Sequence, residues 1–162
     1  MEKKTVYRRI REELGMSREE ACDLLECIAV DKLVRIENGK QKPSPADIIY
    51  MAEKYKCPRL CNYYCANECE IGAKTVPQIK PKELSQIVLE ILASLNTIEK
   101  EKDRLVEIAV DGKISREELA DLLHIRDELG GISATVASLR LWVDEMMARN
   151  AAENASGAKK RQ

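Results

Sequence analysis

A repeat of seven residues is the feature that most restricts how this chain can fold. The repeat occurs in two series, each stepping alternately by four and by three residues. The first series is Leu84, Val88, Ile91, Leu95, Ile98, Lys102, Leu105 and Ala109, and the second is Leu122, Ile125, Leu129, Ile132, Val136, Leu139, Val143 and Met146. This spacing places an apolar stripe along one side of an α-helix. We therefore expect two long amphipathic helices of similar length.

The segment between the two series carries signals that end one helix and start another. Asp111-Gly112 breaks the first helix, because glycine adopts the backbone conformations that terminate helices. Ser115, with Glu118 three residues later, has the pattern of a capping box at the start of the second helix. A short connection places the two helices side by side in opposite directions. The sequence thus predicts an antiparallel coiled-coil hairpin over residues 82–149.

Further apolar residues flank the two stripes of the predicted hairpin. They are Ile87, Leu92, Leu119, Leu123, Leu141 and Met147. Two helices alone leave such residues partly in water, so we expect the hairpins of two chains to pair into a four-helix bundle and form a homodimer. Packing of the hairpin onto the N-terminal part of its own chain is the alternative. Gly130-Gly131 is expected to loosen or bend the second helix.

The N-terminal third has the pattern of short helices separated by breaks. Helices are expected at about residues 5–14, 17–25, 29–37, 44–56 and 58–68. Capping-box patterns that begin at Ser17 and Ser44 start the second and fourth of them. Asn38-Gly39 ends the third, because both residues tolerate a positive φ. These helices predict a compact helical domain.

Composition divides the chain into four segments. Residues 1–71 hold the short helices, and GAKTVPQIKP at 72–81 contains two prolines and few apolar residues, which is typical of an extended linker. The hairpin occupies residues 82–149, and the polar tail at 150–162 is expected to be disordered. The predicted fold class is therefore all-α, with an N-terminal helical domain, a linker and a C-terminal hairpin.

Composition also excludes several classes of protein. No run of about 18 apolar residues occurs, so no membrane span is expected. The start, MEKKTVYRRI, lacks the apolar core of a signal peptide, which predicts a cytoplasmic location. The net charge of −1 gives no general attraction to nucleic acid, so affinity for DNA depends on where charges are placed. No nucleophile elbow, phosphate-binding glycine loop or two-histidine metal motif occurs, so we expect no enzyme.

Two N-terminal segments together carry a family pattern. IREELGMSREEACDLL is followed by LVRIENGKQKPSPADIIYMAEKY, which sets RIENGKQKPS at the proper distance from MSREEA. This combination resembles the helix-turn-helix domain of Cro and the phage repressors, the XRE family. The resemblance covers about the first 65 to 70 residues and implies a lambda-repressor-like bundle of five helices. It also implies a sequence-specific transcriptional regulator that binds double-stranded DNA as a dimer.

The resemblance assigns roles to individual residues. It implies a scaffold helix from about residue 18 to 25 and a recognition helix from about 30 to 37. Arg11 and Glu37 match a structural ion pair between the first and third helices. The residues that the resemblance places at DNA are Arg18, Val30, Asp31, Lys32, Val34, Arg35, Asn38, Lys40 and Lys42. Among these, Arg35 suits a guanine edge and Asp31 a cytosine, and the loop from Asn38 onward suits phosphates.

Two departures from the family pattern bear on these expectations. The turn between the second and third helices is usually Leu-Gly-Ile, but here it is LECI at residues 25–28, one residue longer and without glycine. The recognition helix also presents no Gln or Asn for adenine, which leaves it a small set of base-contacting groups. A second interpretation follows, in which the chain is a protein-interaction or sensor module on a helix-turn-helix scaffold.

Four cysteines recur at steps of four residues, at Cys57, Cys61, Cys65 and Cys69. On one continuous helix they would span about 18 Å, so all four cannot bind a single tetrahedral zinc ion unless the helix breaks. Three interpretations stay open. The cysteines are small core residues, Cys61, Cys65 and Cys69 bind zinc or an iron–sulfur cluster, or their reversible oxidation controls DNA binding. No other cofactor is expected.

Overall fold

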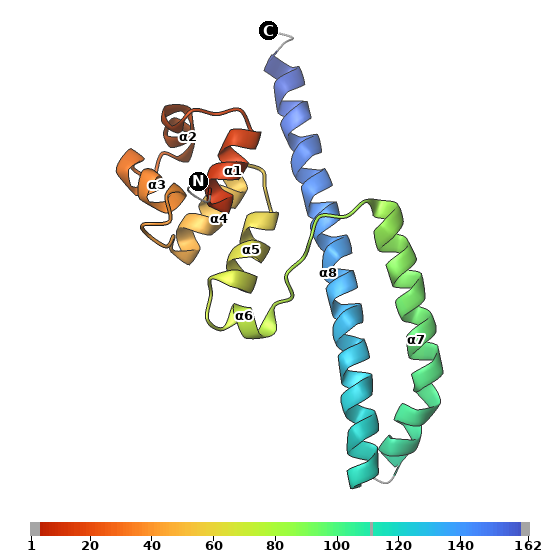
Figure 1. The fold of residues 1–162 in the computed structure, drawn as a ribbon. Helices are drawn as coiled ribbons and strands as arrows, with labels where there is room; N and C mark the ends of the chain where they lie inside the picture. Colours follow the sequence, from red (N-terminus) through yellow and green to blue (C-terminus); the bar gives the residue numbers. More distant parts are fainter. Residues whose placement is uncertain (1–3, 111, 160–162) are drawn as a thin grey trace. The chain divides into compact units, whose positions relative to one another are not determined.

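The computed structural model describes residues 4–110 and 112–159 as an all-α chain (Figure 1). The helices, in chain order, are α1 (Val6–Glu13), α2 (Arg18–Leu25), α3 (Val30–Glu37), α4 (Pro45–Lys54), α5 (Arg59–Asn67), α6 (Gly72–Thr75), α7 (Leu84–Val110) and α8 (Arg116–Lys159). They form two compact units. One unit contains the first 78 residues together with the chain from Asp144 onward, and the other runs from Ile79 to Val143. The predicted all-α class, with short N-terminal helices followed by a long hairpin, is confirmed.

Hydrogen bonds at the starts of α2 and α4 follow the capping patterns in the sequence. The Ser17 hydroxyl accepts from the Glu20 amide, and the Glu20 carboxylate accepts from the Ser17 amide. Ser44 and Asp47 form the same pair of bonds at α4. Each box satisfies backbone donors that the first turn of a helix leaves without a partner. The predicted starts of both helices are confirmed.

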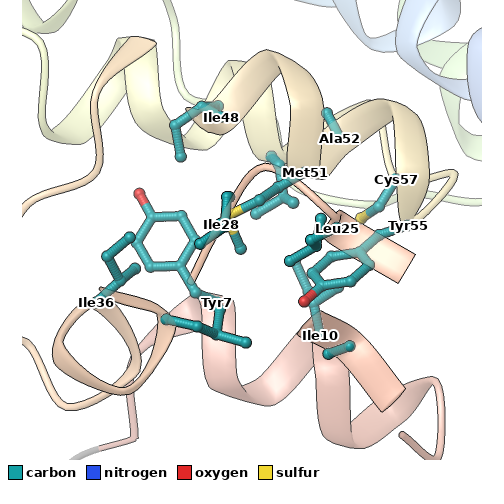
Figure 2. Packing of buried hydrophobic residues seen from close by; sticks show 13 residues of the cluster. Tyr7, Ile10, Leu25, Ile28, Ile36, Ile48, Met51, Ala52, Tyr55 and Cys57 are labelled. Atoms are coloured by element: carbon teal, nitrogen blue, oxygen red, sulfur yellow. The ribbon is translucent and has the colours of Figure 1, made fainter. Parts of the chain in front are cut away.

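The N-terminal helices share one hydrophobic core, in which side chains from α1 to α4 point toward one another (Figure 2). Its buried members are Tyr7, Ile10, Ala21, Leu25, Ile28, Leu33, Ile36, Ile48, Met51, Ala52, Tyr55, Cys57 and Leu60. Burial of one large aliphatic side chain stabilises a fold by about 1.5–3 kcal/mol. Helix α3 contributes Leu33 and Ile36 to this core. The core therefore fixes α3 by one face and leaves the opposite face at the surface of its unit.

Helix α6 occupies the start of the segment that the sequence predicted to be an extended linker. It packs against α5, and Gly72 permits this contact because a Cβ atom there would overlap the carbonyl group of Cys65. After Thr75 the chain has no regular secondary structure until α7 begins. The irregular connection therefore begins after residue 75, later than the predicted start at residue 72. A helix of one turn has too little periodicity to be recognised in the sequence.

Helices α7 and α8 form the predicted antiparallel hairpin (Figure 1). Near their connection, Arg104 on α7 pairs with Asp121 on α8, with Nη2 and Oδ2 2.6 Å apart. The start of α8 has the expected cap, in which the Ser115 amide donates to the Glu118 carboxylate at 2.8 Å. The Glu118 amide donates in return to the Ser115 hydroxyl at 3.2 Å. Hydrogen bonds and an ion pair thus define the closed end of the hairpin.

The buried side of each long helix is offset by one residue from part of the predicted stripe. Buried or half-buried positions include 87, 94, 101 and 108 on α7 and 121, 128, 135 and 142 on α8. Of the stripe residues that directly follow them, Leu122 is half-buried. The exposed large apolar ones are Val88, Leu95, Leu129, Val136 and Val143. We call these five residues the outer apolar columns. The apolar surface of the hairpin is therefore wider than one neighbouring helix covers.

Helix α8 continues through Gly130 and Gly131, where the sequence suggested a looser or bent helix. The Thr135 hydroxyl donates to the Gly131 carbonyl at 3.0 Å, so this carbonyl has a side-chain partner as well. The helix extends to Lys159, so that residues 150–159 of the predicted disordered tail belong to α8, and residues 160–162 lie outside the described residues. Within residues 4–110 and 112–159, no helix is long and apolar enough to cross a membrane.

Candidate nucleic-acid interface

Helices α2 and α3 are joined by a tight turn at residues 26–29. Glu26 begins this turn with φ 31° and ψ −45°. Residues other than glycine adopt a positive φ only at an energetic cost. The amides of Cys27 and Ile28 both donate to the Leu25 carbonyl, and the Ile28 side chain is buried in the core. The turn is therefore anchored at both ends but strained at Glu26.

Replacing Glu26 with glycine is expected to raise the free energy of unfolding by up to about 1 kcal/mol, because glycine removes the strain of a positive φ. Urea denaturation measures this change. Glu19→Gly is the matched control, since Glu19 lies within α2, where glycine costs about 0.5–1 kcal/mol. Equal destabilisation by both substitutions would show that Glu26 is not strained.

A buried ion network joins the first three helices behind α3. The Glu37 carboxylate accepts from Arg11 Nε at 2.5 Å, from Arg11 Nη2 at 3.0 Å and from Arg18 Nε at 2.8 Å. Arg11 Nη1 also donates to the Met16 carbonyl at 2.6 Å. The hydrogen bond to Glu37 raises the pKa of Arg11 above its usual value, although burial acts in the opposite direction. Because each of the three helices supplies one charged residue, the network fixes α3 relative to α1 and α2.

The outer face of α3 carries several of the residues that the sequence placed at DNA. Val30, Asp31 and Arg35 are exposed, and Val34 is half-buried. The opposite face of the helix is held in the core and in the ion network. The residues expected to meet a DNA groove therefore share one exposed surface.

Lys32 has a different role from its neighbours on α3. Its ammonium group lies 2.6 Å from Asp47 Oδ1, which links α3 to the capping box of α4. Burial acts to raise the pKa of Asp47, but the hydrogen bonds from Lys32 and Ser44 outweigh it, so the pKa lies below its usual value. Arg18 is likewise occupied, because its Nε donates to the buried Glu37. Both cations stabilise the domain before any ligand is bound.

The end of α3 satisfies its last carbonyl groups with its own loop. Gly39 has φ 68°, and its amide donates to the Ile36 carbonyl at 3.0 Å. The Lys40 amide donates to the Arg35 carbonyl at 2.8 Å, which completes a Schellman motif. These amides are therefore not available to a phosphate. The loop offers cationic side chains instead, since Lys40 and Lys42 are exposed and neither forms an ion pair within the described part of the chain.

Residues 8–60, from α1 to the start of α5, match a family model described as a helix-turn-helix domain. This part of the chain is a helix-turn-helix domain. The match includes the turn at residues 26–29, the ion network and the outer face of α3, and it leaves the hairpin outside. A search of curated proteins and a search of solved structures each gave no match.

Two residues that support α3 in the helix-turn-helix domain were not singled out from the sequence. The hydroxyl of Thr5 donates to the Glu37 carbonyl at 2.8 Å and so ties the start of α1 to the end of α3. Gln41 accepts a hydrogen bond from Arg35 Nε at 3.0 Å. Thr5 could be expected only as a helix cap, because its second contact depends on how α1 and α3 pack. Gln41 lies in the middle of a polar loop and has no motif of its own.

The cysteines around α5 lie in different surroundings. Cys57 precedes the helix and is buried, whereas Cys61 and Cys65 lie on the helix and Cys69 follows it, all three half-buried. Within the described residues, no three Cys, His, Asp or Glu side chains are placed to hold a metal ion together. Desolvation raises the pKa of the Cys57 and Cys61 thiols, which disfavours the thiolate that binds metals and reacts with oxidants. The structure does not bring Cys61, Cys65 and Cys69 together as a ligand set.

Proposed function

We propose that this chain binds duplex DNA with α3 in the major groove and acts as a dimeric transcriptional regulator of the XRE type. The observation that carries the proposal is the exposed outer face of α3, followed directly by Lys40 and Lys42, two cations that form no ion pair within the described residues. An α-helix fits the width of the major groove, and cations beside it neutralise phosphates. The ion network behind α3 supports this role, because a helix held in place loses little freedom when it binds.

The exposed residues suit different parts of a DNA site. Arg35 can donate to a guanine edge, Asp31 can accept from cytosine, and Val30 and Val34 can contact thymine methyl groups. Asn38, Lys40 and Lys42 face phosphates in this proposal, in which the lysines bind through their side chains. Arg18 and Lys32 each use one N–H group to bind a carboxylate, so only their other N–H groups can bind a phosphate. Phosphate contacts thus supply most of the affinity, and a small set of side chains supplies the sequence preference.

Replacing both Lys40 and Lys42 with glutamine is expected to weaken binding to duplex DNA of any sequence. If each lysine meets one phosphate, the slope of log affinity against log salt becomes shallower by about 2. Fluorescence anisotropy of the full chain with a labelled random-sequence duplex, over a series of salt concentrations, measures this slope. Lys74→Gln with Lys80→Gln is the matched control, because both residues are exposed lysines outside the matched domain.

An unchanged slope in the Lys40 and Lys42 double variant would remove the loop from the interface. Absence of any duplex binding by the unaltered chain at low salt would contradict DNA binding itself. The second candidate is a protein-interaction role, which is favoured by the exposed Val30 beside Asp31 on α3. Absence of duplex binding would support this second candidate.

The dimeric state is proposed from the outer apolar columns. On both helices these residues follow the inward positions by one residue, so in an antiparallel pair both columns fall on the same side of the hairpin. Leu95 is 55% exposed and Val136 is 49% exposed, although their spacing is that of core residues. A second hairpin presenting the same face would cover them in a four-helix bundle with twofold symmetry. Dimerisation also suits a helix-turn-helix protein that binds two half-sites.

Leu95→Lys combined with Val136→Lys is expected to convert the dimer to a monomer, because charges would replace apolar contacts at the centre of the bundle. Sedimentation equilibrium of the full chain at micromolar concentration measures the mass. Leu89→Lys with Leu123→Lys is the control, since both leucines are exposed but lie two positions beyond inward residues, on the other side of the hairpin. A monomeric unaltered chain, or a double variant at residues 95 and 136 that stays dimeric, would contradict the proposal.

A further inference from the structure

Arg35 and Gln41 are joined twice, through the backbone and through the side chains. The carbonyl of Arg35 accepts from the Gln41 amide at 3.2 Å, in addition to the Lys40 amide at 2.8 Å. The Nε of Arg35 donates to the Gln41 side-chain oxygen at 3.0 Å. Because the backbone bond fixes where Gln41 lies relative to α3, the side-chain bond fixes where the guanidinium lies.

The partner of Arg35 differs in kind from those of other arginines in the same unit. Arg8, Arg11, Arg18 and Arg59 each pair with a carboxylate. Arg35 is held by a neutral amide, and no carboxylate in the described part of the chain forms an ion pair with it. Its positive charge is therefore not compensated locally, although its side chain is constrained. A constrained but uncompensated cation is suited to an anionic or electron-rich partner.

The geometry of the bond also selects which N–H groups Arg35 can offer. Nε is occupied by Gln41, so the guanidinium presents its two Nη groups as a fork. Guanine is the base with two acceptors, O6 and N7, side by side in the major groove, and a fork of two N–H donors matches them. Without Gln41, Arg35 would be released toward Asp31, which lies four residues earlier on the same face of α3.

We propose that Gln41 is a positioning residue that holds Arg35 in the conformation required to recognise guanine. This inference rests on the proposed function, because it assumes that α3 lies in the major groove. Gln41 makes no base contact in this arrangement. Its effect passes through Arg35. Its side-chain N–H groups make no hydrogen bond within the part of the chain that the structure describes, and in this arrangement they donate to a nearby phosphate.

The test starts with selection of duplexes from a random library by the full chain. Anisotropy is then measured on the selected duplex and on copies in which single guanines are replaced by 7-deazaguanine, which lacks the N7 acceptor. One guanine in each half-site is expected to lose about tenfold in affinity when N7 is removed. Inosine at the same position is the control, because it keeps O6 and N7 and lacks only the minor-groove amino group. Arg35→Ala should abolish the loss caused by 7-deazaguanine.

Substitutions of Gln41 separate positioning from general affinity. Gln41→Ala is expected to weaken binding to the selected duplex by about threefold to tenfold and to reduce the 7-deazaguanine effect, with little change on unrelated duplex. Gln41→Glu keeps an acceptor for Arg35 Nε, so it should retain the 7-deazaguanine effect while its added negative charge weakens binding to every duplex. Gln86→Ala on α7, which removes an exposed glutamine bonded to Glu90, is the control and should change neither quantity.

Three results would overturn the inference. A 7-deazaguanine effect that disappears in Arg35→Ala but is unchanged in Gln41→Ala would show that Arg35 needs no positioning. Selected duplexes without any guanine that depends on N7 would show that Arg35 does not recognise guanine. Both results leave DNA binding intact, whereas failure of the unaltered chain to bind any duplex would defeat the proposed function as well.

Discussion

Glu37→Ala is expected to lower the free energy of unfolding of the helix-turn-helix domain by about 3–5 kcal/mol. The carboxylate is fully buried between Arg11 and Arg18, and its removal leaves the buried guanidinium of Arg11 without its ionic partner. An unpaired buried charge costs far more than the net value of the pair, because the charge cannot recover its hydration. Urea denaturation followed by circular dichroism measures the loss. Glu53→Ala, at an exposed position of α4, should change stability little.

A double substitution tests the physical reason for this loss. Arg11→Met together with Glu37→Met removes the charged pair and keeps apolar volume, so most of the stability lost in Glu37→Ala should return. The recovery is expected to be incomplete, since Arg18 keeps its charge but loses its acceptor. If the double variant lost as much free energy of unfolding as the two separate substitutions together, the ion pair itself, and not the unpaired charge, would determine the effect.

Gly72→Ala is expected to destabilise the contact between α5 and α6 by about 1–3 kcal/mol. A Cβ at this position would lie 2.8 Å from the Cys65 carbonyl carbon and closer still to its oxygen, and both are backbone atoms that cannot rotate away. Helix α6 must then shift or detach. Hydrogen exchange at the amides of Ala73 and Val76, which donate to the Cys69 and Gly72 carbonyls, measures the loosening directly.

Gly130→Ala is the matched control for this substitution. Apart from its chain neighbours and the backbone of its own helical turns, no atom of the described residues lies within 4 Å of a Cβ built at Gly130. Alanine there should therefore stabilise α8 by up to about 1 kcal/mol, because it favours the helical conformation more than glycine does. If Gly72→Ala did not lower stability more than Gly130→Ala, this result would contradict the close packing of α6 against α5.

Local signals in the sequence predicted the helices and their caps well. Ser17, Ser44 and Ser115 were expected to start helices, and each forms the hydrogen bonds of a capping box. A cap involves residues only three positions apart, so the sequence contains all of its parts. Gly39 likewise ends α3 as expected, because its positive φ is a local property.

Features that depend on packing between distant segments were predicted less well. The apolar stripe of the hairpin was expected to form its seam, but ten of its sixteen residues are exposed. Periodicity fixes which residues share a face and not which neighbour covers that face. The bond between Lys32 and Asp47 was not foreseen, since it depends on where the start of α4 lies beside α3. The roles in DNA binding of all the residues assigned by resemblance stay predictions.

One ion pair of the helix-turn-helix domain lies where the resemblance implied it. Arg11 and Glu37 were paired by analogy and lie in contact in the structure. That analogy placed Arg18 at DNA and did not include it as a second partner of Glu37. The strain at Glu26 was also hidden, although the absence of the usual glycine from the turn was the signal that could have revealed it.

Helix α3 separates the residues that hold it from the residues that it displays. Its inner side is fixed by Leu33, Ile36 and the Glu37 carboxylate, whereas the exposed positions 30, 31 and 35 take no part in that core. A laboratory could therefore exchange the displayed side chains to redirect the domain toward another target and still keep a folded scaffold. Variants at these three positions form a natural library for such retargeting.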